Sequence, residues 1–408
     1  MNEHLIEKRS FVVTLGLMTG IAALTVDISL PAIPAMVDAL ATSLPKAQQI
    51  VGVFMAGMAL GQIPSGLLSD RMGRMPVLYV GMLIFSVAAV VAAASNNIGL
   101  ILVARFVQGF GAASAIVLSR AIVRDVASGI AAARLMSLMA MIFTAAPVIA
   151  PSIGALLIVQ WGWRAPFIAI AVCALLMLFA IRANLAETHV PNAQGHPLRQ
   201  LQKSTREFFS HRQSIFGLLL VIVPPAGYMS IIAISAALTV EIYGFSVQQY
   251  GIIFAFAGVS ILVGSALNRW LVTRLSQISL IALGVVLIGL SGAQLLLIAW
   301  LDSAPFWWVW LCVCMFMFTI AIVVSNGTVL ALDPLPKVAG VASSIIGTLQ
   351  NIVGAAGALI AASIYDGTIR NSVLIMGAVG ATVAVIFLLR PLIAPGPLVH
   401  HPDELARD

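Results

Sequence analysis

Apolar stretches of about 20 residues recur along the whole chain, separated by short segments that contain charges, proline and glycine. A helix of about that length crosses about 30 Å of hydrocarbon. Of the 408 residues, 61% are hydrophobic and only 9% are charged. A soluble globular domain would have about 25% charged residues. The sequence therefore predicts an all-α polytopic membrane protein.

About twelve such stretches can be delimited from the punctuating residues. The first is longer than the apolar core of a signal peptide, and no small-residue cleavage pattern follows a short apolar region, so we expect it to be retained. The predicted spans cover residues 11–31, 48–68, 76–95, 99–121, 133–158, 165–182, 214–240, 247–268, 277–300, 304–331, 338–363 and 371–390.

The longest polar stretch, Arg182 to Gln213, divides the predicted helices six and six. We expect an N-terminal six-helix bundle at 1–182, a cytoplasmic linker at 183–213, a C-terminal six-helix bundle at 214–390 and a cytoplasmic tail at 391–408. The amphipathic part of the linker, Leu198 to Phe209, is predicted to lie along the membrane surface, with partner binding as the alternative.

A weak internal repeat supports two related bundles. The segment LSDRMGRMPVLYVG, from Leu68 to Gly81, is similar to LVTRLSQISLIALG, from Leu271 to Gly284. Each follows the second helix of its half. The repeat predicts bundles related by an axis along the membrane normal, with a substrate cavity between them.

Lysine and arginine predict the orientation. With both termini inside, about 17 of the 21 basic residues fall on the cytoplasmic side, and Lys46, Arg164 and Arg370 fall outside. This distribution accounts for the net charge of +6, and no basic patch with interleaved aromatic residues indicates nucleic-acid binding.

Several chemistries lack a sequence basis. None of the four lysines follows a glycine, so there is no phosphate-binding GxxxxGK loop. The histidines fall in loops and tails without metal-ligand spacing, and Cys312 and Cys314 point to different helix faces. We therefore expect no enzymatic activity, no cofactor and no metal site.

The turn between the second and third spans reads GLLSDRMGRMPVL, from Gly66 to Leu78. Gly66 allows two helix ends to approach closely, and Asp70 can accept bonds from backbone amides or pair with an arginine. A solvated turn that only anchors the helices on the inner side is the alternative. The pattern is carried by Gly66, Asp70, Arg71, Gly73 and Arg74.

The fifth span contains APVIAPSIGA, from Ala146 to Ala155. Pro147 and Pro151 each remove an intrahelical hydrogen bond, while Gly154 and the alanines permit tight packing against a neighbouring helix. We expect a bent, closely packed helix, and a kink that serves packing alone is the alternative.

Two lone charges lie inside predicted spans. Asp27 lies in ALTVDISLPAIP, and Arg105 lies in RFVQGFGAA, which also contains Gln108, Gly109 and Gly111. Both charges are predicted at similar depths in the same half, so each is the expected partner of the other. An acid in hydrocarbon usually marks a pathway or a pairing partner, and a permanent structural ion pair is the alternative reading.

These motifs together resemble the major facilitator superfamily, and within it the Bcr/CflA group of drug/proton antiporters, which exports bicyclomycin, chloramphenicol and florfenicol. The resemblance covers essentially the whole chain. It implies that Asp70 forms a conformational latch with the eleventh helix and with Arg120 or Arg124, and that the proline helix seals the interface against leak. The residue before Pro147 is Ala146, where many antiporters have glycine; this variant is familiar in the Bcr/CflA group and leaves the substrate open.

The resemblance implies a proton-coupled antiporter of small amphipathic drugs in a bacterial inner membrane, working as a monomer with a small molecule, protons and lipid as its partners. Asp27 and Arg105 would couple the proton. An exporter of a metabolite, such as an amino acid or nucleobase derivative, is the alternative, and a membrane receptor or assembly protein is the alternative from another class. Substrate contacts are expected among Tyr228, Asn326, Gln350 and Asn351, which could equally join helices.

Overall fold

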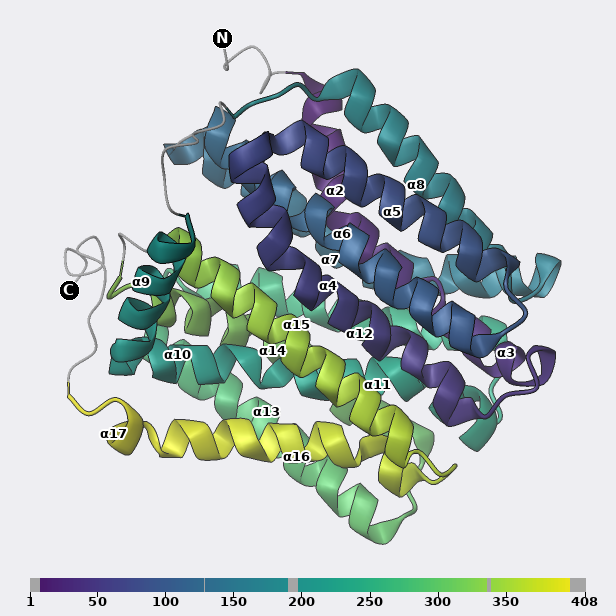
Figure 1. Ribbon diagram of the computed structural model, residues 1–408. Helices are drawn as coiled ribbons and strands as arrows, with labels where there is room; N and C mark the ends of the chain where they lie inside the picture. Colours follow the sequence, from purple (N-terminus) through teal and green to yellow (C-terminus); the bar gives the residue numbers. More distant parts are fainter. Residues whose placement is uncertain (1–7, 128, 190–196, 336–338, 397–408) are drawn as a thin grey trace. The chain divides into compact units, whose positions relative to one another are not determined.

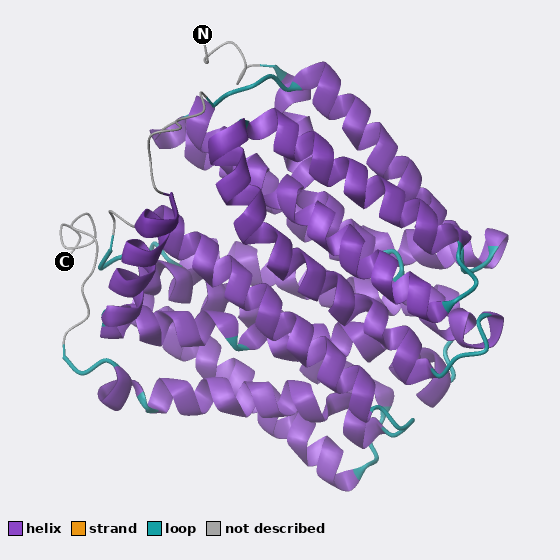
Figure 2. Cartoon of the chain, in the orientation of Figure 1, coloured by secondary structure: helices purple, strands orange, loops and turns teal. Residues whose placement is uncertain are grey.

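The computed structural model describes residues 8–127, 129–189, 197–335 and 339–396. Every regular element among them is helical (Figures 1 and 2). Within these residues, 12 helical segments are long and apolar enough to cross a membrane, which confirms the predicted all-α polytopic architecture. The predicted linker and tail lie partly outside the described residues, at 190–196 and 397–408.

The first half of the chain contains seven α-helices and a short 3₁₀ turn within the described residues. They are α2 (Arg9–Asp27), η1 (Leu30–Ala32), α3 (Ile33–Ala39), α4 (Leu44–Met72), α5 (Arg74–Ala94), α6 (Ile98–Val126), α7 (Gly129–Trp161) and α8 (Ala165–Asn184).

The second half begins with an amphipathic helix and includes one short π-helical segment. Its elements are α9 (Pro197–Ser210), α10 (Arg212–Ile222), α11 (Pro224–Ala237), η2 (Leu238–Ile242), α12 (Val247–Leu271), α13 (Gln277–Leu301), α14 (Phe306–Leu332), α15 (Ala339–Ile364), α16 (Ile369–Leu388) and α17 (Arg390–Ile393).

Packing groups the described residues into two compact units. The first unit combines residues 1–195 with 232–258, and the second combines 196–231 with 259–408. The segment 232–258, which runs from α11 into α12, therefore packs with the first half of the chain. The predicted bundle boundaries at 182 and 214 follow chain order and stay a prediction.

In the first unit, α6 lies beside α4 on one side and α5 on the other (Figure 1). The helices touch at glycine: a Cβ atom added to Gly57 would collide with the carbonyl oxygen of Phe106, and one added to Gly109 would collide with that of Phe54. On the α5 side, Gly111 faces the backbone of Gly81 and Phe85. Small residues thus bring these helix backbones into direct contact.

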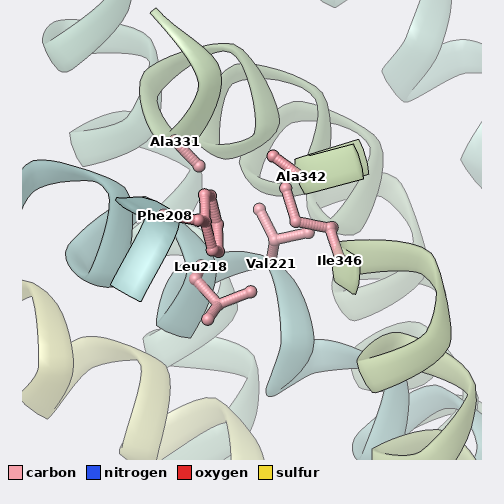
Figure 3. Close-up of a cluster of buried hydrophobic side chains, with 6 residues drawn as sticks. All are labelled: Phe208, Leu218, Val221, Ala331, Ala342 and Ile346. Atoms are coloured by element: carbon pink, nitrogen blue, oxygen red, sulfur yellow. The ribbon is translucent and has the colours of Figure 1, made fainter. Parts of the chain in front are cut away.

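In the second unit, α9 is anchored by Phe208, whose side chain is fully buried. Figure 3 shows its ring among side chains from three other helices: Leu218 and Val221 of α10, Ala331 of α14, and Ala342 and Ile346 of α15. The neighbouring Phe209 is 43% exposed. The predicted surface helix is therefore docked on the protein by one face, and its placement at a membrane surface stays a prediction.

We expect Phe208→Ala to destabilise the protein by about 3 kcal/mol or more, because it removes a buried ring and leaves a cavity. Phe209→Ala, one residue away, is the matched control and should cost much less. Thermal unfolding of the two detergent-purified variants measures the difference, and equal midpoints would contradict the anchoring role.

Candidate functional site

The first membrane helix ends at Asp27 because a proline follows shortly after it. Pro31 has no backbone N–H to continue the helix, and the chain passes through Ile28 and Ser29 into the η1 turn. The Ser29 hydroxyl donates a hydrogen bond to the carbonyl of Val26, 2.8 Å away. Asp27 is 3% exposed. The sequence thus places a buried carboxylate at a break in a membrane helix.

Arg105 is completely buried, and neutral oxygens surround its guanidinium group. It donates to the side-chain oxygen of Gln108 at 2.9 Å and to the carbonyl of Ile50 at 3.4 Å. It also reaches the carbonyl of Thr25 and the hydroxyl of Ser29, each at 3.5 Å. The guanidinium carbon lies 4.6 Å from the centre of the Phe54 ring. Arg105 therefore fixes α2 against α4 and α6.

The expected ion pair between Asp27 and Arg105 is not formed in this structure. Both residues are described, and neither a hydrogen bond nor an ion pair to any described residue reaches the Asp27 carboxylate. The reason is helical geometry. Thr25 and Ser29 are four residues apart and share the face that meets Arg105, whereas Asp27 is rotated about 200° from Thr25.

The α7 helix packs beside the break that follows Asp27. A Cβ atom on Gly154 would collide with the carbonyl oxygen of Ile28, so the two backbones touch. Two residues earlier on α7, the hydroxyl of Ser152 donates to the carbonyl of Gly251, 3.0 Å away on α12. One turn before Ser152 on α7, Val148 packs against Gly258 of α12. The segment containing Pro147 and Pro151 thus lies between α2 and α12.

Tyr250, next to Gly251, is a functional candidate that the sequence reasoning missed. Its side chain is fully buried, and its hydroxyl lies 2.9 Å from the hydroxyl of Ser235. The carbonyl of its neighbour Gly251 accepts the Ser152 bond on α7, two residues from Gly154, which touches Ile28 beside Asp27. No motif surrounds it, and only the packing of 232–258 on the first half reveals its position.

The turn between α4 and α5 is held by Arg74 rather than by Asp70 alone. The buried Arg74 side chain donates to Asp70 at 2.5 Å, to Asp125 at 2.9 Å and to the hydroxyl of Ser69 at 2.9 Å. Asp125, at the end of α6, was not predicted. A Cβ atom added to Gly66 would lie 3.7 Å from the Val117 side chain, an ordinary contact distance.

The arginines expected to meet Asp70 lie elsewhere. Arg120 and Arg124 are exposed, and no ion pair joins Asp70 to either of them among the residues that the structure describes. Arg71, a member of the turn motif, is also exposed. The expected link from the turn to the end of α6 is present, but it runs from Arg74 to Asp125.

Glu187, at the start of the predicted linker, caps α5. Its carboxylate accepts bonds from the backbone N–H groups of Arg74 at 2.8 Å and Met75 at 2.9 Å. Gly73 has φ of +95°, and a Cβ atom there would lie 2.6 Å from the Glu187 carboxylate, so glycine permits this approach. Burial acts to raise the pKa of Glu187, but four backbone N–H donors outweigh it and hold that pKa below its ordinary value.

The polar residues expected to contact substrate differ in what they bind. Asn326 is almost fully buried and donates both to Asn268 of α12 and to the carbonyl of Ile322, so it joins helices. Gln350 donates to the carbonyl of Val221 at 3.4 Å, and Asn351 to that of Gly347 within its own helix. Tyr228 is half-buried on α11.

The cap predicts a pH-dependent contribution to stability. The pKa of the Glu187 carboxyl group is lower in the folded protein than in the unfolded chain. The cap therefore stabilises the protein fully at a pH above the pKa of Glu187 in the unfolded chain. This stabilisation is lost as the pH falls through the pKa of Glu187 in the folded protein. At neutral pH, Glu187→Gln should cost about 1 kcal/mol. Thermal unfolding at neutral and acidic pH measures this difference.

The difference between Glu187→Gln and the wild type should shrink in acid. Glu207→Gln, on the exposed side of α9, is the control and should change little at either pH. A difference for Glu187→Gln that is constant with pH would argue against the carboxylate cap.

Comparison with known proteins identifies similar sequences along the chain. The model of the Major Facilitator Superfamily matches residues 15–358. A bicyclomycin resistance protein homolog of Haemophilus influenzae is 30% identical, over 90% of this chain and 92% of its own. Multidrug resistance protein MdtL of Shewanella oneidensis is 30% identical, over 93% and 94%. Multidrug resistance protein D of Escherichia coli is 27% identical, over 83% and 84%.

Solved structures with the same fold are more distant in sequence. A peptide transporter, POT, crystallised with sulfate, superposes with a TM-score of 0.74 at 16% identity, covering 94% of both chains. A D-xylose-proton symporter also gives a TM-score of 0.74 at 16% identity, covering 93% of this chain and 96% of its own. At this identity the likeness concerns the fold alone.

Proposed function

Because the chain belongs to the Major Facilitator Superfamily, a family of membrane transporters rather than enzymes, we propose that it exports small amphipathic drugs in exchange for protons. The drugs would be phenicol- or bicyclomycin-like, and export would proceed across the bacterial inner membrane by alternating access. Relatives named for bicyclomycin and multidrug resistance support this proposal. The single observation that carries it is the buried Asp27 carboxylate, which has no ion-pair partner among the described residues.

Asp27 is the proton carrier in this proposal. A buried carboxyl group without a counter-charge is most stable in its neutral form, whereas contact with water favours the ion. Entry of substrate from the cytoplasm would change the hydration of Asp27 and release its proton to that side. After the substrate leaves, the carboxylate would take up a proton from outside.

In this scheme Arg105 has a structural role and does not form an ion pair with Asp27. Its bonds to Thr25 and Ser29 hold the two residues that flank Asp27 at the helix break. It therefore sets the direction of the Asp27 side chain without neutralising it. The Gln108 amide, bonded to the same guanidinium, keeps this arrangement in place.

Two further groups of contacts, at α7 and at Arg74, would control alternating access. The packing of Gly154 and Ser152 on neighbouring backbones would seal α7 against leak. The bonds of Arg74 to Asp70 and Asp125 would stabilise one of the access states. The protein would work as a monomer, with both termini in the cytoplasm, as its distribution of basic residues indicates.

Proton coupling is tested in proteoliposomes with a panel of phenicols, bicyclomycin, amino acids and nucleobases under an imposed pH gradient. Wild-type protein should accumulate a drug only with the gradient, and a protonophore should abolish this. Asp27→Asn should lose gradient-driven transport and keep drug binding. Asp38→Asn, an exposed acid on α3, is the matched control.

If the wild-type protein transports drug at the same rate with and without the pH gradient, the antiporter proposal is wrong. Gradient-driven movement of amino acids or nucleobases, with no movement of drugs, would instead favour a metabolite exporter.

Charge removal at the latch should slow turnover. We expect Asp125→Asn and Asp70→Asn each to lower the transport rate about tenfold while drug affinity stays within about twofold, because a bond specific to one state is worth about 1.4 kcal/mol. Glu207→Gln, which removes an exposed acid on α9 outside the latch, should transport normally. Normal rates in Asp125→Asn would exclude the Arg74 to Asp125 bond from the latch.

A further inference from the structure

Tyr250 and Asp27 approach the same turn of α7 from two directions. Ser152 of that turn bonds to Gly251, the neighbour of Tyr250, and Gly154 touches Ile28, the neighbour of Asp27. Both side chains are buried, Tyr250 completely. A buried hydrogen-bond donor and a buried acid without a partner among the described residues therefore flank the same turn of α7.

The direction of the Tyr250 hydrogen bond can be assigned. The Ser235 hydroxyl has one hydrogen, which it donates to the carbonyl of Ile232 at 3.0 Å. Toward Tyr250 it can therefore act only as the acceptor, and the phenol donates to it across 2.9 Å. The Tyr250 hydroxyl has a single hydrogen, so it cannot donate a well-aligned hydrogen bond to Ser235 and to Asp27 at the same time.

We propose that Tyr250 is a positioning residue for proton exchange, which moves its hydrogen bond from Ser235 to the Asp27 carboxylate when that group loses its proton. The proton of Asp27 leaves to water, the phenol keeps its own hydrogen, and only the acceptor of its hydrogen bond changes. Since Tyr250 belongs to the segment 232–258, this step would draw α12 toward α2 in the deprotonated state and relax it on reprotonation. The inference rests on the proposed role of Asp27 as proton carrier.

Other titratable groups lie on the elements packed around Asp27 and Tyr250. Arg105 is directed to Thr25 and Ser29, on another face of α2. Glu241 is exposed, and Tyr243 is half-buried. The titratable groups on the described elements packed against α2, and in 232–258, are Arg105, Arg120, Arg124 and Asp125 on α6, Arg134 on α7, Cys173 and Arg182 on α8, and Glu241, Tyr243 and Tyr250.

The test is an infrared titration of the full-length protein in detergent, which needs neither substrate nor a gradient. The Asp27 signal is the protonated-carboxyl band that Asp27→Asn removes. In Tyr250→Phe, half-deprotonation of this band should move to higher pH by about one unit, because the ion loses a hydrogen bond. Ser235→Ala removes the competing acceptor and should move it to lower pH.

Combined variants and a control separate this role from simple packing. Tyr250→Phe/Ser235→Ala should titrate like Tyr250→Phe, since the serine acts only through the phenol. Tyr243→Phe should titrate like the wild type. A wild-type midpoint in a folded Tyr250→Phe protein would overturn the inference while leaving the antiporter proposal intact. A wild-type protein that shows no titrating Asp27 band would overturn both.

Discussion

The contact between α4 and α6 determines where the charged residues of the first unit can lie. Helices gain little hydrophobic energy by meeting in lipid, so close backbone packing must hold them together. Gly57 and Gly109 remove the side chains that would separate the two backbones. This contact fixes the register of the helices and places Arg105 opposite the carbonyl of Ile50 and the ring of Phe54. The arginine then holds the end of α2, and that end carries Asp27.

Close packing also surrounds the proposed proton site at α7. Its prolines remove backbone hydrogen bonds, and Ser152 and Gly154 let the helix touch α12 and the turn after Asp27. The contact of Ser152 with α12 and the contact of Gly154 with the turn after Asp27 are two residues apart on one helix. A movement of α12 would therefore change both contacts. Small side chains leave little room for gradual adjustment, so such an interface favours discrete arrangements.

The sequence was sufficient to predict which segments span the membrane and which charges are buried. It was not sufficient to predict which side chains contact one another, because that depends on the direction in which each side chain points. The twelve spans, the buried Asp27 and the buried Arg105 follow from hydropathy and the depth of lone charges. Depth alone suggested that the two charges pair, but helical rotation carries Asp27 away from the face that meets Arg105. Asp125 and Glu187 make their contacts across long stretches of chain, and no local pattern marks them or Tyr250. The closely following Pro31 accounts for the end of α2 at Asp27.

The two buried charges differ in what they can exchange. A guanidinium keeps its charge at any physiological pH, and neutral oxygens of Gln108, Ile50 and Thr25 compensate that charge in place. Such a group can fix a structure but cannot carry a proton at neutral pH. A carboxyl group can lose its charge, and Asp27 lacks the fixed partners that would hold it in one form. If Arg105 paired with Asp27 directly, it would lock the acid in its charged form. By holding Thr25 and Ser29 instead, the arginine would leave the acid free to exchange a proton in the proposed scheme.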